Sequence, residues 1–114
     1  MISDSLYAKY INEREGAHIV ETPSGFCTYK IKNQECFIID LFVAQEARKS
    51  GEARRLIELL NSIAHESDCN VITANILLAD PGANTTLAAS LAIGFSVKRA
   101  NADVLLITLP IKED

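Results

Sequence analysis

The chain has 114 residues, of which 48% are hydrophobic and 23% are charged, and its formal net charge is −4. This length fits one domain, 1–114, and the composition is that of an ordinary soluble globular protein. The negative net charge argues against binding along a nucleic-acid backbone, which depends on many Lys and Arg contacts.

The sequence also disfavours a metal site, a secretory signal and a membrane span. Cys27, Cys36 and Cys69 are widely spaced and form no CxxC pair, so we expect no metal site and three reduced, half-buried thiols. The N-terminus lacks the basic start and apolar core of a secretory signal. The uncharged segment 81–97 is interrupted by turn residues and is shorter than the ~20 apolar residues of a membrane span. We therefore expect a cytoplasmic protein with no membrane contact.

The first half of the chain predicts one helix followed by three strands. Apolar residues at helical spacing predict a helix over 3–15 that ends at Gly16, because glycine readily adopts the left-handed geometry of helix ends. Runs of strand-forming residues, separated by turn signals at 23–25 and 33–34, then predict strands. The expected strands are 18–22, 26–32 and 35–43. The third is the most apolar, so we expect it to lie centrally in the sheet.

The second half predicts two more helices and three more strands. The strongest helix signal covers 51–67, where apolar residues form a stripe and charged residues fall mostly on the other side. The remaining elements are a strand over 70–78, a helix over 85–93 and a terminal hairpin of 95–99 with 104–110. The order α-β-β-β-α-β-α-β-β predicts a mixed α/β (α+β) domain with helices packed on one twisted, mostly antiparallel sheet.

The junction between the third strand and the long helix carries the main functional signal. Residues 45–55 hold four basic and two acidic side chains, a local positive excess in an acidic protein. The N-terminus of a helix has N–H groups without partners and a partial positive charge, so it can bind phosphate. Gly51 would let an anion approach the backbone because it has no Cβ. Arg48, Lys49 and Arg54 would then neutralise a diphosphate.

On these residues alone, the junction is either a solvated basic helix start or a phosphate-binding turn. The P-loop pattern GxxxxGK[ST] and the dinucleotide pattern GxGxxG are both absent from the sequence. A small anion is favoured over a long polyanion, because the positive charge is confined to one turn.

The segment DLFVAQEARKSGEARRLIELL resembles the acyl-CoA-binding segment of the GNAT N-acetyltransferase superfamily, in which an apolar strand precedes [RQ]-x-x-G-x-[GA] and a helix. Arg48, Gly51 and Ala53 occupy the three signature positions. The segment NTTLAASLAIGF, at 84–95, is similar to the Asn-initiated helix and Gly-Phe pair of the family. The short region before the sheet also resembles compact acetyltransferase-like proteins encoded by bacteriophages.

The resemblance implies the acyl-CoA N-acyltransferase fold and acetyl-CoA as co-substrate. In the family, backbone amides of the signature turn hold the pyrophosphate, and the end of the preceding strand pairs with the pantetheine arm. A splayed strand offers such an arm free N–H and C=O groups. The corresponding residues here are Arg48, Lys49, Ser50, Gly51, Glu52, Ala53 and Arg54 for the pyrophosphate, Leu41, Phe42 and Val43 for the arm, and Asn84 for a further bond to the arm.

Acetyl transfer requires that the amine lose a proton and that the leaving thiolate be protonated or tolerated. Many family members use a tyrosine about four residues before the Gly-Phe pair to protonate the thiolate. This chain has Ser90 there, and serine is a far weaker acid than tyrosine, whose pKa is ~10. For the base we expect Asp40, as a carboxylate buried on the central strand with a raised pKa. The alternative is a structural acid, and Glu35 is interpreted as a surface charge at a hairpin end.

These features favour an acetyl-CoA-dependent N-acetyltransferase that transfers acetyl directly to a primary amine. The missing tyrosine and short N-terminal region favour instead a catalytically weak GNAT-fold protein that contacts a partner protein. A plain phosphate or nucleotide binder is the third hypothesis. We expect an open groove that suits a protein lysine or N-terminus better than an enclosed small amine, and the acidic charge favours a basic acceptor. A homodimer, if one forms, would use the edge near VLLITL, and a phage-encoded protein would act in the host cytoplasm.

Overall fold

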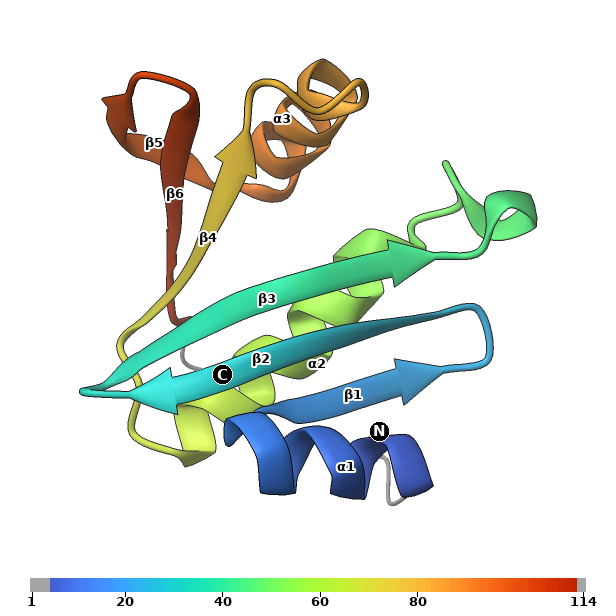
Figure 1. Cartoon of the computed structure of the whole chain (residues 1–114). Helices are drawn as coiled ribbons and strands as arrows, with labels where there is room; N and C mark the ends of the chain where they lie inside the picture. The colour runs from blue at the N-terminus through green and yellow to red at the C-terminus, as the bar shows by residue number, and fades with distance from the viewer. Residues whose placement is uncertain (1–4, 113–114) are drawn as a thin grey trace.

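The computed structural model describes residues 5–112 (Figure 1). The elements are α1 (Leu6–Glu15), β1 (His18–Thr22), β2 (Gly25–Lys32), β3 (Glu35–Val43), η1 (Gln45–Ala47), α2 (Glu52–Glu66), β4 (Val71–Leu77), α3 (Ala83–Ile93), β5 (Ser96–Asn101) and β6 (Val104–Pro110). The predicted order is confirmed, with the short 3-10 helix η1 as an addition. Residues 3 and 4, where the first predicted helix begins, lie outside the described residues.

Glycines end two of the helices as the sequence predicts. Gly16 closes α1 with a left-handed φ of 68°, and its N–H donates to the carbonyl of Asn12, while the N–H of Ala17 donates to the carbonyl of Ile11. Gly94 closes α3 with a φ of 125°. The start of α3 differs from the prediction, because the helix begins at Ala83 after Gly82. Asn84 therefore lies inside the first turn rather than before it.

The described strands form one sheet in the order β1-β2-β3-β4-β6-β5. Every neighbouring pair is antiparallel except β3 and β4, which are parallel. The prediction of a mostly antiparallel mixed sheet with a central third strand is confirmed. The expectation of an edge at VLLITL is wrong, because β6 is paired with β4 on one side and with β5 on the other, so β5 is the edge strand. Within residues 5–112, no helix has the length and apolarity needed to cross a bilayer.

The two faces of the sheet are covered differently. One face packs against α2 and α3 in the larger core, which joins residues such as Leu60 and Ala83 to Cys27, Ile72 and Ile107 of the strands. The other face packs against α1 in a smaller core, which contains Ala8, Ile11, Ile19 and Phe26 but no residue of β4, β5 or β6. In Figure 1, α1 accordingly lies beside β1, far from β4 and β6.

All three cysteines are free, and they are more buried than the sequence suggests, at 0–6% exposure. Burial in the apolar core raises the pKa of the Cys27 and Cys36 thiols to about 12, and it also raises the pKa of Cys69. These thiols are therefore neutral at physiological pH and contribute to packing, because a nucleophilic cysteine needs a low pKa.

The parallel pair β3–β4 is short, and we call it the seam. Its register comprises Glu35↔Val71, Cys36↔Ile72 and Phe37↔Thr73. Beyond these pairs the strands diverge: β3 continues along β2 as far as Val43, and β4 continues along β6 as far as Leu77 (Figure 1). Among the described residues, no strand pairs with the β4-facing edge of β3 after Phe37. The seam is thus closed at one end and open at the other.

Candidate functional site

The open end of the seam leads into a turn that joins β3 to α2. Lys49 has a φ of 65°, and Gly51, which caps the helix, has a φ of 87°. The first intrahelical hydrogen bond runs from the N–H of Arg55 to the carbonyl of Gly51, over 3.0 Å. The N–H groups of residues 52–54 consequently have no acceptor within the helix. Such a group of N–H donors, at the positive end of a helix of 15 residues, can bind an anion.

The structure gives Gly51 a more specific role than the sequence does. A Cβ at this position would meet no atom within 4 Å, so glycine is not required to avoid a clash within the protein. The left-handed φ is what favours glycine, because other L-residues are strained there. The empty space around Gly51 also leaves the backbone of the turn accessible to a ligand.

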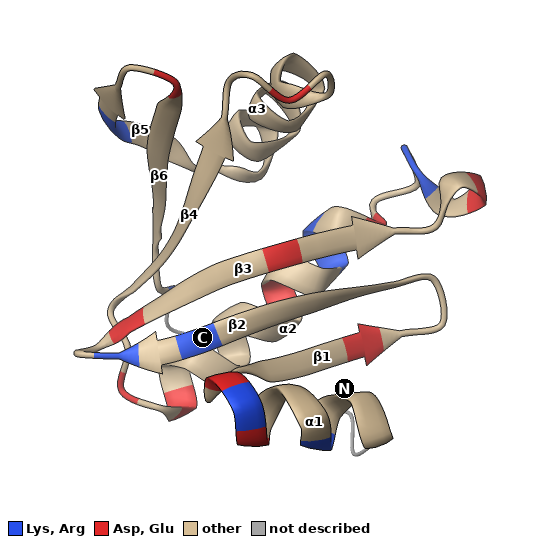
Figure 2. Cartoon of the chain, viewed as in Figure 1, with Lys and Arg blue, Asp and Glu red and all other residues tan. Residues whose placement is uncertain are grey.

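The three cations expected at the turn point in different directions. Arg48 donates from Nε to the carbonyl of Val43 over 3.0 Å, and its guanidinium lies 5.9 Å from the ring centre of Phe42. Arg54 donates to the carbonyl of Ala92, at the end of α3, over 2.9 Å. Lys49 is exposed and has no partner among the described residues. Lys49 is therefore the cation that is most available to an anion, and Figure 2 shows basic residues in this turn and at the start of α2.

Two other residues of the turn use their side chains internally. The carboxylate of Glu52 accepts a hydrogen bond from the hydroxyl of Thr22, so its negative charge is held at the turn between β1 and β2. The hydroxyl of Ser50 donates to the carbonyl of Ala47. Ala53 is half-buried. These three residues can meet a ligand at the turn only through their backbone groups, as the family resemblance implies.

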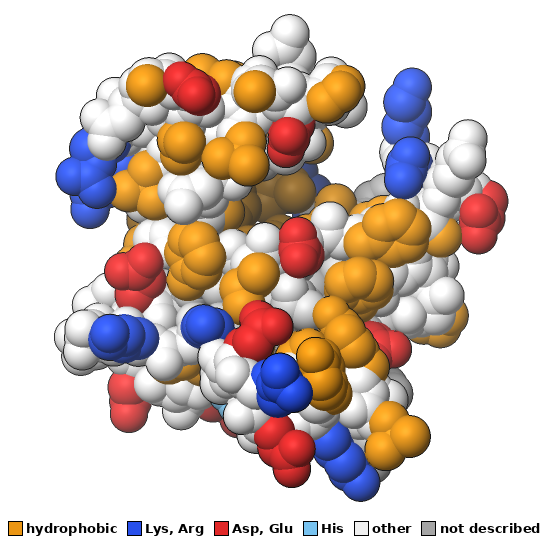
Figure 3. All heavy atoms as spheres, in the orientation of Figure 1, with side chains coloured by type: hydrophobic (Ala, Val, Ile, Leu, Met, Phe, Trp, Pro, Cys, Tyr) orange, Lys and Arg blue, Asp and Glu red, His pale blue; other side chains and the backbone are white. Residues whose placement is uncertain are grey.

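The end of β3 is exposed where the seam is open. Leu41 and Phe42 are 37% and 46% exposed, which is high for large apolar side chains on a strand in the middle of a sheet. Val43 is half-buried, and its carbonyl is already bonded to Arg48. The space-filling view is hollowed between the end of β3 and the part of the molecule that carries β4 and α3 (Figure 3). The free edge of β3 and its apolar side chains border this hollow.

The predicted burial of Asp40 is wrong, since its side chain is exposed. Its N–H donates to Thr28 Oγ1 over 3.1 Å, next to a register shift in the β2–β3 pair. The physical reason for the exposure is the early divergence of β4, which leaves β3 after Phe37. In addition, α1 packs against β1 and Phe26 and does not extend over Asp40. A catalytic role for Asp40 stays a prediction, but for an exposed carboxylate.

The two polar residues expected on α3 lie apart from the turn. Ser90 is half-buried and donates from Oγ to the carbonyl of Thr86 over 2.8 Å, so its proton is used within its own helix. Asn84 is exposed in the first turn of α3. No tyrosine of the described chain replaces the missing one: two lie on α1, and Tyr29 is 3% exposed with a pKa that burial raises to about 12.

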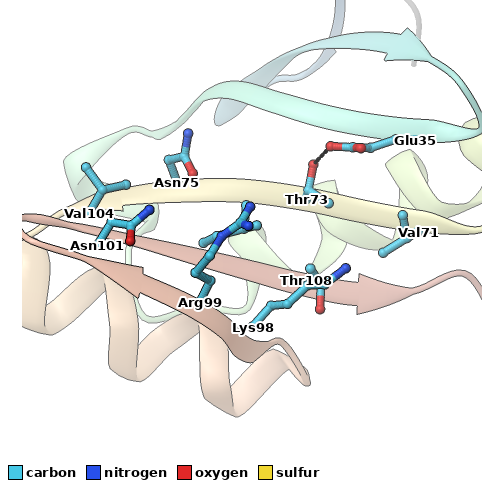
Figure 4. A pocket seen from close by; sticks show the side chains of 10 residues that line it. Glu35, Val71, Thr73, Asn75, Lys98, Arg99, Asn101, Val104 and Thr108 are labelled. Atoms are coloured by element: carbon cyan, nitrogen blue, oxygen red, sulfur yellow. Dashed lines mark hydrogen bonds between the residues drawn. The ribbon is translucent and has the colours of Figure 1, made fainter.

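A second site, which the sequence did not predict, lies on the sheet face opposite α2 and α3. It is a cavity of about 430 Å³ lined by residues of β3, β4, β5 and β6 (Figure 4). Glu35, interpreted from the sequence as a surface charge, is half-buried there and accepts a 2.5 Å hydrogen bond from Thr73 Oγ1. Polar residues at alternate positions of β4, such as Thr73 and Asn75, are the sequence signal that could have indicated this polar face. Nowhere in residues 5–112, this cavity included, do three His, Cys, Asp or Glu side chains group as metal ligands would.

Known proteins give one family and many similar folds. A sequence model described as the acetyltransferase (GNAT) family matches residues 3–86. Curated protein sequences give no significant match. A GNAT-family protein from Desulfovibrio desulfuricans has a similar structure, with a TM-score of 0.73 and 16% identity over 91% of this chain and 76% of its own.

Two further solved structures are similar at the level of the fold. PaiA N-acetyltransferase from Thermoplasma acidophilum, in complex with coenzyme A, has a TM-score of 0.68 and 13% identity; the match covers 76% of this chain and 53% of PaiA. The anti-CRISPR protein AcrVA5 has a TM-score of 0.69 and 18% identity, over 82% of this chain and 97% of its own. Its match in length parallels the short region before the sheet in this chain.

Proposed function

The chain belongs to the acetyltransferase (GNAT) family and has its fold, and from this premise we propose that it is an acetyl-CoA-dependent N-acetyltransferase acting on a primary amine. The observation that carries the proposal is the open seam, which combines an unpaired strand edge with a glycine-capped helix N-terminus. A free strand edge suits an amide-bearing arm, and a helix N-terminus suits a diphosphate. The coenzyme A complex of the similar PaiA fold supports this choice of ligand.

The diphosphate is proposed to bind at residues 48–54, mainly through the N–H groups of Glu52, Ala53 and Arg54. Lys49 adds a cation that has no other partner among the described residues. The carboxylate of Glu52 lies close in sequence, but its bond to Thr22 removes a hydrogen-bond acceptor from the turn. The residues of this turn therefore fit an anionic ligand.

The pantetheine arm is proposed to lie along the edge of β3 at Leu41 and Phe42. Its gem-dimethyl and methylene groups would cover part of these exposed apolar side chains. The carbonyl of Val43 accepts one hydrogen bond from Arg48, and a diphosphate at the turn would attract that guanidinium away from it. Asn84, which is exposed at the start of α3, is proposed to bond to the arm.

Acetyl-CoA supplies an activated acetyl group. In the proposed transfer, the nitrogen of a neutral amine bonds to the thioester carbon, the carbon–sulfur bond breaks with its electron pair going to sulfur, and the amine loses one proton. The thiolate gains one proton, so the products are an acetamide and free thiol. Asp40 is proposed to take the proton of the amine through water. The bond from Ser90 to Thr86 favours solvent as the proton source for the thiolate, with Ser90 orienting that water.

The same bond of Ser90 favours a second candidate function, a GNAT-fold protein with weak or no catalysis that contacts a partner protein. The similarity in fold and length to an anti-CRISPR protein is compatible with this candidate. Under either candidate we propose that the protein acts in the cytoplasm, on a protein amine or a small amine in the first case.

Calorimetry with acetyl-CoA, followed by a thiol-release assay over a panel of amines, distinguishes these functions. Binding with turnover supports the transferase, and binding without turnover supports the second candidate. The site is tested with Gly51→Val, which should weaken acetyl-CoA binding by about tenfold or more, because it adds bulk and strain where the diphosphate binds.

The matched control is Gly16→Val at the end of α1. Gly16 also has a left-handed φ, of 68°, and a Cβ added there would likewise meet no atom within 4 Å, so its substitution brings the same strain. This control should lose similar stability and keep its affinity for acetyl-CoA. Equal affinity in both variants would contradict the assignment of the turn.

A further inference from the structure

The cavity on the sheet face opposite α2 and α3 has a charge pattern that the fold alone does not require. Lys98 and Arg99 line it from β5, Glu35 lines it from β3, and the neutral polar side chains of Asn75 and Thr108 line it from β4 and β6 (Figure 4). Neither the Lys98 side chain nor the Arg99 side chain has a hydrogen bond or ion pair with a described residue. The lining therefore carries two unpaired cations and one carboxylate, in a protein whose net charge is −4.

A bulge in β5 brings the two cations together. Val97 pairs with Ile107 and Arg99 pairs with Leu106, so Lys98 is an extra residue in β5. In a regular strand, neighbouring side chains point to opposite faces, and only one of these two would face the cavity. The bulge lets both Lys98 and Arg99 line it. Bulges often re-aim side chains beside functional sites, and here the bulge directs two exposed cations of the edge strand to one cavity.

Glu35 lies at the opposite side of the cavity, against the seam. Its Oε2 accepts from Thr73 Oγ1 over 2.5 Å, which fixes the carboxylate. Glu35 and Thr73 both belong to the three register pairs that close the seam. The cavity therefore extends from the closed end of the seam to the two cations on β5. Its volume of about 430 Å³ falls within the range of small-molecule sites.

We propose that this cavity selects the acceptor of the transferase, and that the acceptor is a small amine that also carries a carboxylate. Arg99 and Lys98 bind the carboxylate, because a guanidinium forms paired, charge-assisted hydrogen bonds with that group. Glu35 attracts the ammonium group to the seam side, where that group releases one proton to solvent and becomes the neutral amine that reacts. This inference rests on the proposed function, since it names the substrate class of that site.

The experiment compares ω-amino carboxylates, from glycine to 6-aminohexanoate, with their carboxamides in the thiol-release assay. For at least one length, the carboxylate should have a kcat/KM about tenfold or more above that of its carboxamide, as expected for a hydrogen-bonded charge. Arg99→Gln should reduce this ratio to below about threefold, mainly by lowering the kcat/KM of the carboxylate. Lys9→Gln, which removes an exposed cation from α1, should keep the ratio.

A ratio near one at every length, or an equal loss for both substrates in Arg99→Gln, would overturn the inference. Failure of the proposed function is recognised separately, as absence of acetyl-CoA binding or of turnover. In that case the same amino carboxylates are titrated against the protein by calorimetry. Binding that Arg99→Gln abolishes and Lys9→Gln preserves would support the cavity, and absence of binding would exclude it.

Discussion

The two halves of the sheet are built alike, but the junction between them is built differently. In one half β2 and β3 pair from Gly25↔Val43 to Lys32↔Glu35, and in the other β4 and β6 pair from Val71↔Pro110 to Leu77↔Val104. The seam between the halves has only the three pairs at Glu35, Cys36 and Phe37. Each half is thus stabilised along its length, whereas the junction is stabilised at one end. The free strand edge that a ligand can use exists because the seam stops early.

The closed end of the seam compensates by being buried on the face that the helices cover. Cys36 and Ile72, which face each other across it, are both 0% exposed. Main-chain bonds from Asn70 N–H to the Gln34 carbonyl and from Ile111 N–H to the Asn70 carbonyl hold the same end. At the open end, the bond from Arg54 to the carbonyl of Ala92 links α2 to α3. We therefore expect large stability effects at the closed end and ligand effects at the open end.

The largest effect is expected for Ile72→Ala at the closed end. Removing most of a fully buried side chain should lower the free energy of unfolding by about 2–5 kcal/mol, measured by urea denaturation. The control is Leu77→Ala on the same strand, where the side chain is 50% exposed and the loss should stay within about 0.5 kcal/mol. Similar losses for the two variants would mean that the seam is not packed more tightly at its closed end.

A smaller effect is expected for Gly25→Ala. Gly25 lies on β2, which pairs with β3 on the side opposite the free edge. A Cβ at Gly25 would lie 2.4 Å from the carbonyl oxygen of Phe42, so the end of β3 must shift. We expect a loss of about 1–3 kcal/mol in unfolding free energy, together with weaker acetyl-CoA binding. The control Gly82→Ala has a φ of −91° and no atom within 4 Å, and it should change neither quantity. Unchanged affinity of Gly25→Ala for acetyl-CoA would contradict the proposal that the ligand binds along the edge of β3.

The smallest effect is the dependence of stability on pH. It tests whether the seam excludes water as well as the interior of the β1–β3 half of the sheet does. Cys36 lies at the seam and Cys27 within β2, and burial raises both pKa values to about 12. Between about pH 9 and 12 the unfolded chain loses these thiol protons while the folded chain keeps them, so the free energy of unfolding should fall as pH rises. Below the unfolded pKa, the contribution of the thiols is constant.

Urea denaturation across this pH range gives the slope of stability against pH. Cys27→Ala and Cys36→Ala should each flatten that slope to a similar degree, because each removes one titrating thiol from the unfolded chain. If Cys36→Ala left the slope unchanged while Cys27→Ala flattened it, then Cys36 would be solvated and the seam would be open at both ends.

Much of this fold could be predicted from local signals. The helix stops at Gly16 and Gly94, the apolar stripe of α2 and the turn at Asn33 are all encoded within a few neighbouring residues, and the structure confirms each one. From β1 onward, the bounds of the elements differ from the predicted ones by at most two residues. The family signature likewise lies in one continuous segment, so it can be identified without knowing which strands are neighbours.

The features that could not be predicted depend on contacts between distant segments. Asp40 was expected to be buried because its strand is central, but burial at that position depends on where β4 leaves β3. The cavity requires β6 to lie between β4 and β5, and it also requires a register shift at Lys98. The use of Ser90 within its own helix depends on a rotamer choice. Sequence periodicity specifies faces, but it does not specify neighbours, registers or rotamers.

The central claim is that acetyl-CoA binds in the open seam with its diphosphate at the N-terminus of α2. The most direct test is an NMR titration of isotope-labelled protein with acetyl-CoA, following the backbone amides. We predict saturable shifts that are largest at 41–43 and 49–54, with little change at the comparable left-handed turn at Gly16. Saturable shifts elsewhere that leave 49–54 unaffected, or no shifts at all, would contradict the account.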